Sequence, residues 1–379
     1  MSERVVFANQ LRGVAAVAVA VSHLLGVYWL IRPAVTAATF TAPLEGPDSP
    51  WVWLVLHPWF NLGPFGVGLF FLISGLVIPI SLERHGRGSF LLARGLRIYP
   101  VYVAALLVEL LVLRGNAALW GRDFAYGSWT VLSNLLLIQD LVHQPSIDLV
   151  NWTLCIELRF YVVMALVAGA VRRGSVAAVF GVAGVAVALN LAVARGWFGA
   201  VATPEALGYW VSMEALFIIF MLIGGLFNFH LRGLVGGAGL AVGVAAMGGV
   251  FALCWRMSVL AGQWPGVPFN YGCALGVFAA LYAVRRRVPD NRVLDGMAAI
   301  SFPFYCVHSL VGYSVLKLLM MRFGWGYPAA LAGAVAVVVA VAGALHASVE
   351  AWGVRRGRML ARGARGKDPA IVHEGVRVS

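Results

Sequence analysis

Apolar stretches of about 20 residues recur along this 379-residue chain. A helix needs about 20 residues to cross the hydrocarbon core of a bilayer, and lipid offers no hydrogen-bond partner to an unpaired backbone. Such stretches lie near residues 10–31, 61–82, 97–114, 150–171, 175–194, 208–229, 233–254, 268–284, 297–320 and 327–349. The sequence therefore predicts an all-α, polytopic integral membrane protein with about ten transmembrane helices.

Composition and charge exclude other classes of protein. The chain is 61% hydrophobic and 12% charged, whereas a soluble domain is about half apolar and a quarter charged. The net charge of +12 does not indicate nucleic-acid binding, because the arginines form short clusters between apolar runs, where they set membrane topology. The four cysteines lie in or beside apolar runs without CxxC spacing, so we expect core residues, no metal site and no permanently bound cofactor.

The distribution of Arg and Lys orients the predicted spans. With a cytoplasmic N-terminus, 20 of the 28 basic residues fall on the inner side and seven on the outer side, in line with the positive-inside rule. We expect cytoplasmic termini and a multi-pass protein of the plasma (inner) membrane, with residues 1–350 embedded in the bilayer. Residues 351–379 form a basic tail, disordered or lying on anionic lipid. Residues 115–149 form an outer loop, in which 128–143 is interfacial or re-entrant.

Ionisable side chains inside the bilayer are costly and therefore functional candidates. His23 lies eleven residues after Arg12, which is about 16 Å along a helix. Arg12 is expected near the cytoplasmic face and His23 near mid-membrane, where a neutral imidazole can act as a general base. Glu157 lies at a similar depth in its own span, so His23 is its expected partner. The alternatives are a histidine satisfied by a neighbouring group and a structural ion pair at Glu157.

Residues 63–102 combine small residues with paired arginines. The glycines and Ser74 form a thin helix face that allows close packing or ligand approach. Arg94 and Arg97 are three residues apart, so they share one helix face and can bind one polyanion together. Ordinary topology anchors are the alternative for these arginines.

The run 297–320 carries a proline and a histidine inside a predicted span. Pro303 is expected to kink this helix and to free a backbone carbonyl. His308 lies about midway along the run, so it joins the candidate functional residues.

Five longer segments follow one another along the membrane region. They are LRGVAAVAVAVSH (11–23), FGVGLFFLISGLVI (65–78), RGLRIYPVY (94–102), NWTLCIELRFY (151–161) and ISFPFYCVH (300–308). The first has a basic residue, ten residues and then His, and the third has Arg-x-x-Arg followed by Tyr-Pro. Each is weakly specific alone, but in this order they resemble the membrane-bound acyltransferase-3 family.

Members of that family move acyl groups, usually acetyl from acyl-coenzyme A, onto hydroxyls of sugars and related acceptors. The resemblance implies acyl-coenzyme A as a co-substrate from the cytoplasm and a sugar or glycoconjugate as acceptor. It implies that Arg94 and Arg97, with Arg12, hold the coenzyme A phosphates at the inner side. Carbohydrate O-acetylation is the expected outcome.

The resemblance also implies the catalytic groups. His23 corresponds to the catalytic histidine, acting as general base or as acyl carrier, and Glu157 would orient it. For the oxyanion, Ser74, Tyr99 and a backbone amide near Pro303 are open alternatives.

The chain departs from the family pattern at two places, and two competing functions stay open. Gly68 stands where many members have a carboxylate, and Leu158 and Arg159 stand where many have Glu-Gln. A secondary transporter or flippase for a lipid-linked sugar would also use kinked helices and intramembrane charges. A non-catalytic scaffold is the third hypothesis.

Overall fold

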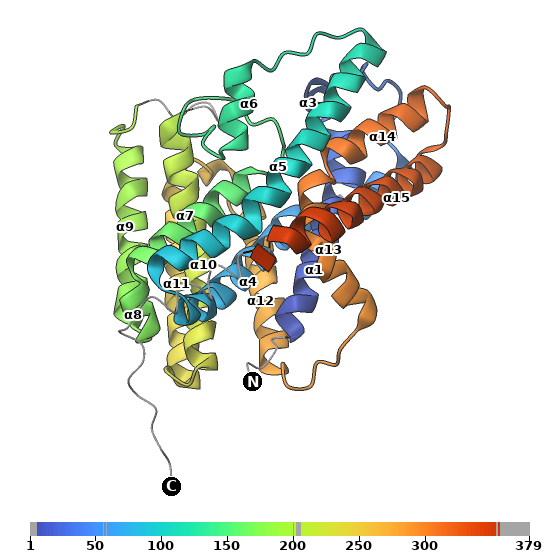
Figure 1. Cartoon of the computed structure of the whole chain (residues 1–379). Coiled ribbons are helices and arrows are strands. Elements are labelled where there is room, and N and C mark those ends of the chain that lie inside the picture. The colour runs from blue at the N-terminus through green and yellow to red at the C-terminus, as the bar shows by residue number, and fades with distance from the viewer. Residues whose placement is uncertain are drawn as a thin grey trace.

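The computed structural model describes residues 6–55, 57, 59–199, 201, 206–353 and 355–356, and in these the chain forms helices and no strands (Figure 1). The α-helices are α1 (Val6–Val21), α2 (Tyr28–Leu30), α3 (Arg32–Thr39), α4 (Leu62–Arg84), α5 (Arg87–Trp120), α6 (Ser128–Leu135), α7 (Trp152–Leu166), α8 (Ala168–Arg172), α9 (Val176–Ala194), α10 (Leu207–Leu231), α11 (Gly237–Met257), α12 (Gly266–Ala283), α13 (Arg292–Val307), α14 (Leu310–Met321) and α15 (Tyr327–Leu345). Two π-helical turns, η1 (Ser22–Val27) and η4 (His346–Glu350), and two 3₁₀ turns, η2 (Pro50–Leu54) and η3 (Ala261–Gln263), complete the described part.

Eight of the described helices are long and apolar enough to cross a membrane, and the bent pair α13–α14 makes up to nine. The sequence predicted ten spans. The difference lies at 150–171, which folds as α7, of 15 residues, and the short α8. A helix of 15 residues rises about 22 Å, which is less than the bilayer core. The predicted tail after residue 356 lies outside the described residues.

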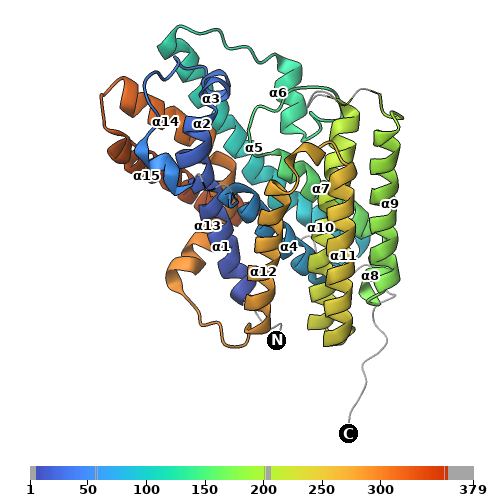
Figure 2. The ribbon, with the colours of Figure 1, turned by 180° about the vertical axis from the view of Figure 1, so that it is seen from behind.

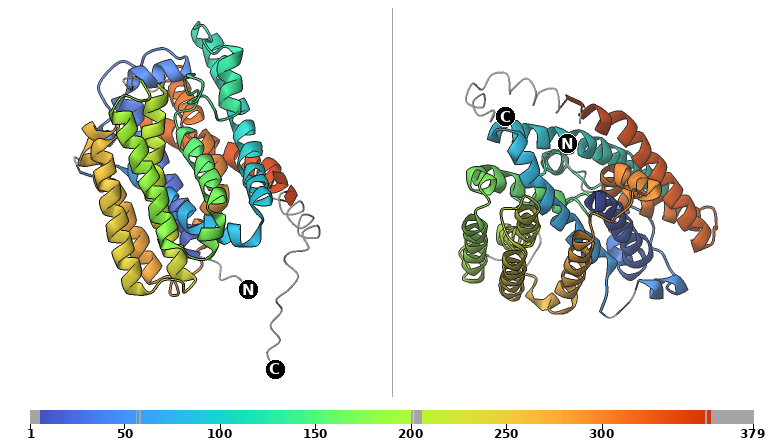
Figure 3. Two further views of the ribbon diagram at one scale, coloured as in Figure 1. Left: turned by 90° about the vertical axis from the view of Figure 1, so that its left-hand side faces the viewer. Right: turned by 90° about the horizontal axis from the view of Figure 1, so that it is seen from below.

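The centre of the molecule is the crossing of α4 and α10. α10 is the most completely buried of the apolar helices, and α9, α11 and α12 stand in a row on the outside of this pair (Figures 2 and 3). At the crossing, Gly75 of α4 faces Gly224 of α10, and a Cβ on either would collide with the opposite backbone. The predicted thin face of α4 therefore serves close helix packing.

Long helices α5 and α15 run obliquely across the other side of the molecule (Figure 1). Between α5 and α7, the segment that contains α6 turns inward from the end opposite the N-terminus. Tyr99 and Tyr102, near the middle of α5, donate to the carbonyls of Leu136 and Asn134. Halfway along α7, Arg159 pairs with Asp140. The predicted interfacial or re-entrant segment therefore packs one side against the helices, through buried residues such as Asn134 and Asp140, and leaves Trp129 and Leu132 exposed.

The helix predicted over 297–320 is broken rather than kinked at its proline. α13 continues through Pro303, and the bend of 73° lies at residues 308–309, between α13 and α14. The Ser309 hydroxyl donates to the Asp148 carboxylate at 3.1 Å, and the backbone N–H of Val150 also bonds that carboxylate. A buried side-chain contact therefore lies at the bend, which is five residues after Pro303.

Candidate active site

His23 lies in the π-helical turn η1, directly after α1. π-helical turns inside α-helices are rare and frequently occur at functional sites, because the extra residue per turn redirects side chains. Here the half-buried imidazole lines a cavity, together with side chains from α4, α7, α10 and α12. This His23 cavity encloses about 1130 Å³, part of it open to solvent.

The imidazole of His23 is held by aromatic neighbours. Its Nδ1 and the hydroxyl of Tyr313 form a hydrogen bond of 2.9 Å, and Tyr313 is fully buried. The ring of His308 packs edge-on against it, with 5.0 Å between ring centroids. The predicted pairing of His23 with Glu157 is wrong, because Glu157 bonds other side chains in a different cavity.

His308 is buried at the end of α13. Its Nδ1 bonds the Tyr305 carbonyl at 2.8 Å, and a carbonyl only accepts, so Nδ1 carries the hydrogen. Nε2 finds no partner among the described residues. His308 thus lies against the predicted catalytic histidine with one ring nitrogen unpartnered, and in the neutral ring this nitrogen is an acceptor.

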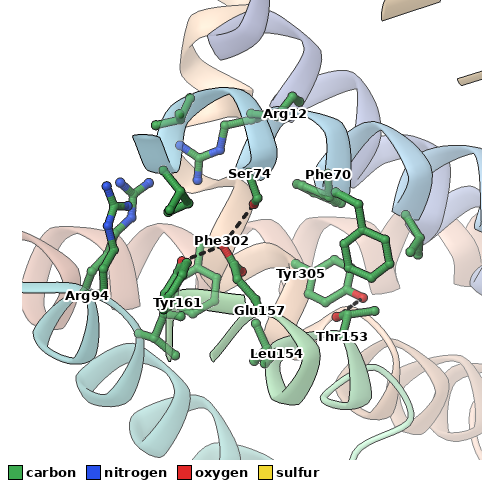
Figure 4. Close-up of a pocket in the computed structure, with 17 residues that line it drawn as sticks. Arg12, Phe70, Ser74, Arg94, Thr153, Leu154, Glu157, Tyr161, Phe302 and Tyr305 are labelled. Carbon is green, nitrogen blue, oxygen red and sulfur yellow. Dashed lines mark hydrogen bonds between the residues drawn. The ribbon is translucent and has the colours of Figure 1, made fainter. Parts of the chain in front are cut away.

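Three arginines line a second cavity (Figure 4). Arg12 comes from α1, and Arg94 and Arg97 from one face of α5, as their spacing predicted. This arginine cavity encloses about 880 Å³, part of it open to solvent. Arg94 stacks on Phe90 and Tyr161, with its guanidinium carbon 5.8 Å and 5.7 Å from the ring centroids. The structure therefore brings together the three arginines that the sequence assigned to one polyanion.

Little in the described protein neutralises these guanidinium groups. Arg12 and Arg97 have no hydrogen bond or ion pair to any described residue. Among the described residues that line the cavity, Glu157 is the one carboxylate. Charged groups held away from bulk water need partners, so the cavity is suited to an anionic ligand with several negative charges.

Glu157 is fixed between two hydroxyls in the same cavity (Figure 4). It accepts from Ser74 at 3.0 Å and from Tyr161 at 2.5 Å. Reasoning from the sequence named Ser74 but missed Tyr161, although Tyr161 lies four residues after Glu157 and therefore on the same helix face.

The two cavities lie toward opposite ends of α1, α4 and α7. Along α1, Arg12 lines the arginine cavity, and Val19 lines the His23 cavity. α4 begins at the His23 cavity and lines the arginine cavity farther along, whereas α7 contributes Trp152 to the His23 cavity and lines the arginine cavity from Thr153 onward. Two residues, Val67 of α4 and Tyr305 of α13, line both cavities. The described helices thus form two adjacent cavities, one lined by three arginines and the other by His23.

Other residues singled out from the sequence have structural partners. Tyr99 lines neither cavity, since its hydroxyl donates to Leu136, which removes it from the oxyanion candidates. Arg159 forms ion pairs with Asp140 at 2.7 Å and with Glu214 at 2.6 Å. These pairs tie α7 to α10 and to the inward-turning loop.

Gly68 explains one departure from the family pattern. A Cβ at this position would lie 2.9 Å from the Ala274 Cβ and 3.2 Å from the Tyr271 ring of α12. The space that a carboxylate would need at position 68 is therefore filled by α12. As for metals, no group of three His, Cys, Asp or Glu in the described ranges is placed to hold an ion.

Comparison with known proteins gives one match. A family model described as an acyltransferase domain, Acyl_transf_3, matches residues 5–347. No curated protein and no solved structure matches the chain. The matched range includes both cavities and every residue that lines them.

Proposed function

The chain belongs to the acyltransferase-3 family, and we propose that it moves an acyl group, acetyl in the family's usual reaction, from acyl-coenzyme A to a hydroxyl of a carbohydrate-type acceptor. The observation that carries this proposal is the pair of cavities that meet at Val67 and Tyr305. One offers three arginines and the other a histidine. A donor with phosphates at one end and a thioester at the other fits such an arrangement.

The donor end of the reaction belongs to the arginine cavity. Coenzyme A carries several phosphate oxygens, and guanidinium groups bind phosphate through paired, charge-assisted hydrogen bonds. With its phosphates on Arg94, Arg97 and Arg12, the pantetheine arm extends between α4 and α7 toward Tyr305. The acyl carbonyl then approaches the His23 cavity.

The acceptor end belongs to the His23 cavity, which is rich in aromatic side chains. Trp152, Tyr209, Trp210, Trp255 and Tyr271 line it. Aromatic rings pack against the apolar faces of sugar rings, and a few polar groups such as Asn61 and Gln263 can fix orientation. This lining supports a carbohydrate-type acceptor.

The chemical step uses the free nitrogen of His23. When Nδ1 carries its hydrogen and donates it to the Tyr313 oxygen, Nε2 holds a lone pair and takes the proton of the acceptor hydroxyl. The hydroxyl oxygen bonds to the acyl carbon, the C–S bond breaks, and the thiolate of coenzyme A takes up the proton from Nε2. In the alternative route, Nε2 bonds to the acyl carbon as the C–S bond breaks and the thiolate leaves; the acceptor oxygen then displaces Nε2 from the acyl carbon, and the hydroxyl proton passes to the thiolate.

Radiolabelled acetyl-coenzyme A with purified protein in nanodiscs tests this proposal. We expect wild type to release coenzyme A and His23→Ala to release it at least about 100-fold more slowly. His57→Ala, an exposed loop histidine outside both cavities, is the matched control. Label trapped on wild type but not on His23→Ala would favour the acyl-histidine route. Neither binding nor release in a well-folded sample would favour a transporter of lipid-linked sugar.

A further inference from the structure

The two cavities adjoin at two side chains. Val67 and Tyr305 are the residues that line both, and each is almost fully buried. This Val67–Tyr305 wall therefore lies on the path proposed for the acyl group from the arginine cavity to His23.

Tyr305 is locked in its position by its neighbours. Its hydroxyl and the Thr153 hydroxyl form a hydrogen bond of 2.8 Å, and the Val150 carbonyl accepts a second, longer bond of 3.4 Å. Its ring packs edge-on against Phe70, with 5.3 Å between centroids. Figure 4 shows this group at the end of the cavity opposite Arg94.

These contacts of Tyr305 join the elements that the donor passes between. Thr153 is on α7 and Phe70 is on α4, while Tyr305 itself is on α13. The Thr153 hydroxyl is also bonded to Val150 at 2.9 Å. The two hydrogen bonds of the Tyr305 hydroxyl contribute little net energy each, so their loss would loosen the side chain while the helices stay folded.

We propose that Tyr305 and Val67 determine which acyl groups are transferred, because they limit the size of the acyl group that passes from the arginine cavity to His23. This inference rests on the proposed acyl transfer. Small groups such as acetyl pass between the side chains of Val67 and Tyr305 with little or no movement of these residues. Longer acyl chains are retained on the arginine side, where their carbonyl does not reach Nε2 of His23.

The first test compares donors of different length. With acetyl-, butanoyl- and hexanoyl-coenzyme A, Val67→Ala is expected to raise the ratio of kcat/KM for hexanoyl over acetyl by about tenfold, since a methylene-sized change in a pocket has effects of this order. Val338→Ala is the matched control, because Val338 is a fully buried valine of α15 that lines neither cavity. Its ratio is expected to stay within about twofold of wild type.

Tyr305→Phe separates the hydrogen bond from the ring. It keeps the aromatic wall and loses the bond to Thr153, so the ratio should move in the same direction as for Val67→Ala. A purely structural Tyr305 would lower kcat/KM for all donors by one common factor and lower the melting temperature. Unchanged ratios in both variants, with near-normal melting temperatures, would overturn the inference.

A second test needs no acyl transfer. The variant Ser74→Cys, in the arginine cavity, is probed in sealed vesicles with a membrane-impermeant methanethiosulfonate added on the side to which the His23 cavity opens. We expect no labelling above the parent protein, and labelling when Val67→Ala and Tyr305→Ala are added. Suppose that the Ser74→Cys variant is labelled only when Val67 and Tyr305 are replaced, but no acyl-coenzyme A is consumed. That result would reject the proposed function and still support a barrier at Val67 and Tyr305. Equal labelling with and without the wall variants would reject the wall itself.

Discussion

At His23, the ring nitrogen Nδ1 bonds a tyrosine hydroxyl rather than a carboxylate. A carboxylate accepts only, so it would hold the hydrogen on Nδ1 and keep Nε2 free. A hydroxyl both donates and accepts, so Tyr313 permits either tautomer of His23. The tautomer that serves as base is therefore set only when the acceptor hydroxyl also bonds Nε2.

Removing this hydroxyl should slow the chemical step without weakening donor binding. We expect Tyr313→Phe to lower kcat by about 10- to 100-fold, because the His23 ring loses its fixed orientation, and to leave KM for the donor within about threefold. Steady-state kinetics of coenzyme A release measure both constants. Tyr28→Phe is the matched control, since within the described ranges the one hydrogen bond of the Tyr28 hydroxyl goes to the Met320 sulfur, at 3.6 Å. Equal losses in the two variants would contradict a special role for Tyr313.

For the paired arginines Arg94 and Arg97 we expect a change in KM for the donor rather than in kcat. Arg94→Ala combined with Arg97→Ala should raise KM for acyl-coenzyme A by at least about tenfold, since two charge-assisted contacts to phosphate are lost. Arg87→Ala, on the exposed first turn of the same helix, should leave KM unchanged. Titration of donor binding by calorimetry checks the assignment. A change confined to acceptor affinity would show that the arginines do not hold the donor.

Among the elements, helix spacing was enough to predict that Arg94 and Arg97 share a face. That Arg12 lies beside these two arginines was predicted from the resemblance to the acyltransferase-3 family. The pairing of Glu157 with His23 failed because depth in the membrane fixes one coordinate only. The direction in which α7 faces depends on its packing, and there it presents Glu157 to Ser74. No pattern in the sequence predicts the role of Tyr313, because the break between α13 and α14 redirects the residues that follow it.

The break between α13 and α14 involves Asp148, which lies in the loop before α7 and accepts a hydrogen bond from Ser309. This contact leads to a prediction about stability and pH. Burial raises the pKa of the Asp148 carboxyl from 3.8 to about 7, although hydrogen bonds from Val150 and Ser309 oppose this. Between these two pKa values the folded protein holds a proton that the unfolded chain has released. Raising the pH across this window therefore removes stability.

Asp148→Asn keeps an acceptor for Ser309 and cannot ionise. Its melting temperature should thus rise relative to wild type as the pH increases from 5 to 7, with a constant difference above about pH 7.5. Thermal unfolding in detergent, followed by tryptophan fluorescence, measures this difference. Ser146→Ala, in the same loop, controls for general loosening, because Ser146 bonds Asn151 and a backbone carbonyl. A difference independent of pH would mean that Asp148 stays ionised in the folded protein.

At the scale of the whole molecule, the sequence predicted an all-helical membrane protein, and the described helices agree in nearly every long apolar run. The exception is 150–171, where the hydropathy of the sequence predicted one span but α7 ends at Leu166 and is too short to cross the bilayer core. Hydropathy also could not reveal two cavities, because cavities arise from side chains on helices that are distant in sequence. Arg12 and Arg94 meet through the packing of helices distant in sequence, since α13 packs against both α1 and α5.

We propose that donor and acceptor enter from opposite sides of the membrane, because Arg12 in the arginine cavity and Val19 in the His23 cavity lie about two turns apart along α1. The predicted topology has the arginine cavity facing the cytoplasm. The single variants Ser128→Cys and Asp290→Cys, both at exposed positions, should then react with impermeant reagents from the outside and the inside, respectively. In sealed right-side-out vesicles, acyl-coenzyme A added outside should not support transfer, whereas acyl-coenzyme A loaded inside should. Transfer from externally added donor, with intact vesicles and the labelling pattern as expected, would mean that the donor does not enter through the arginine cavity.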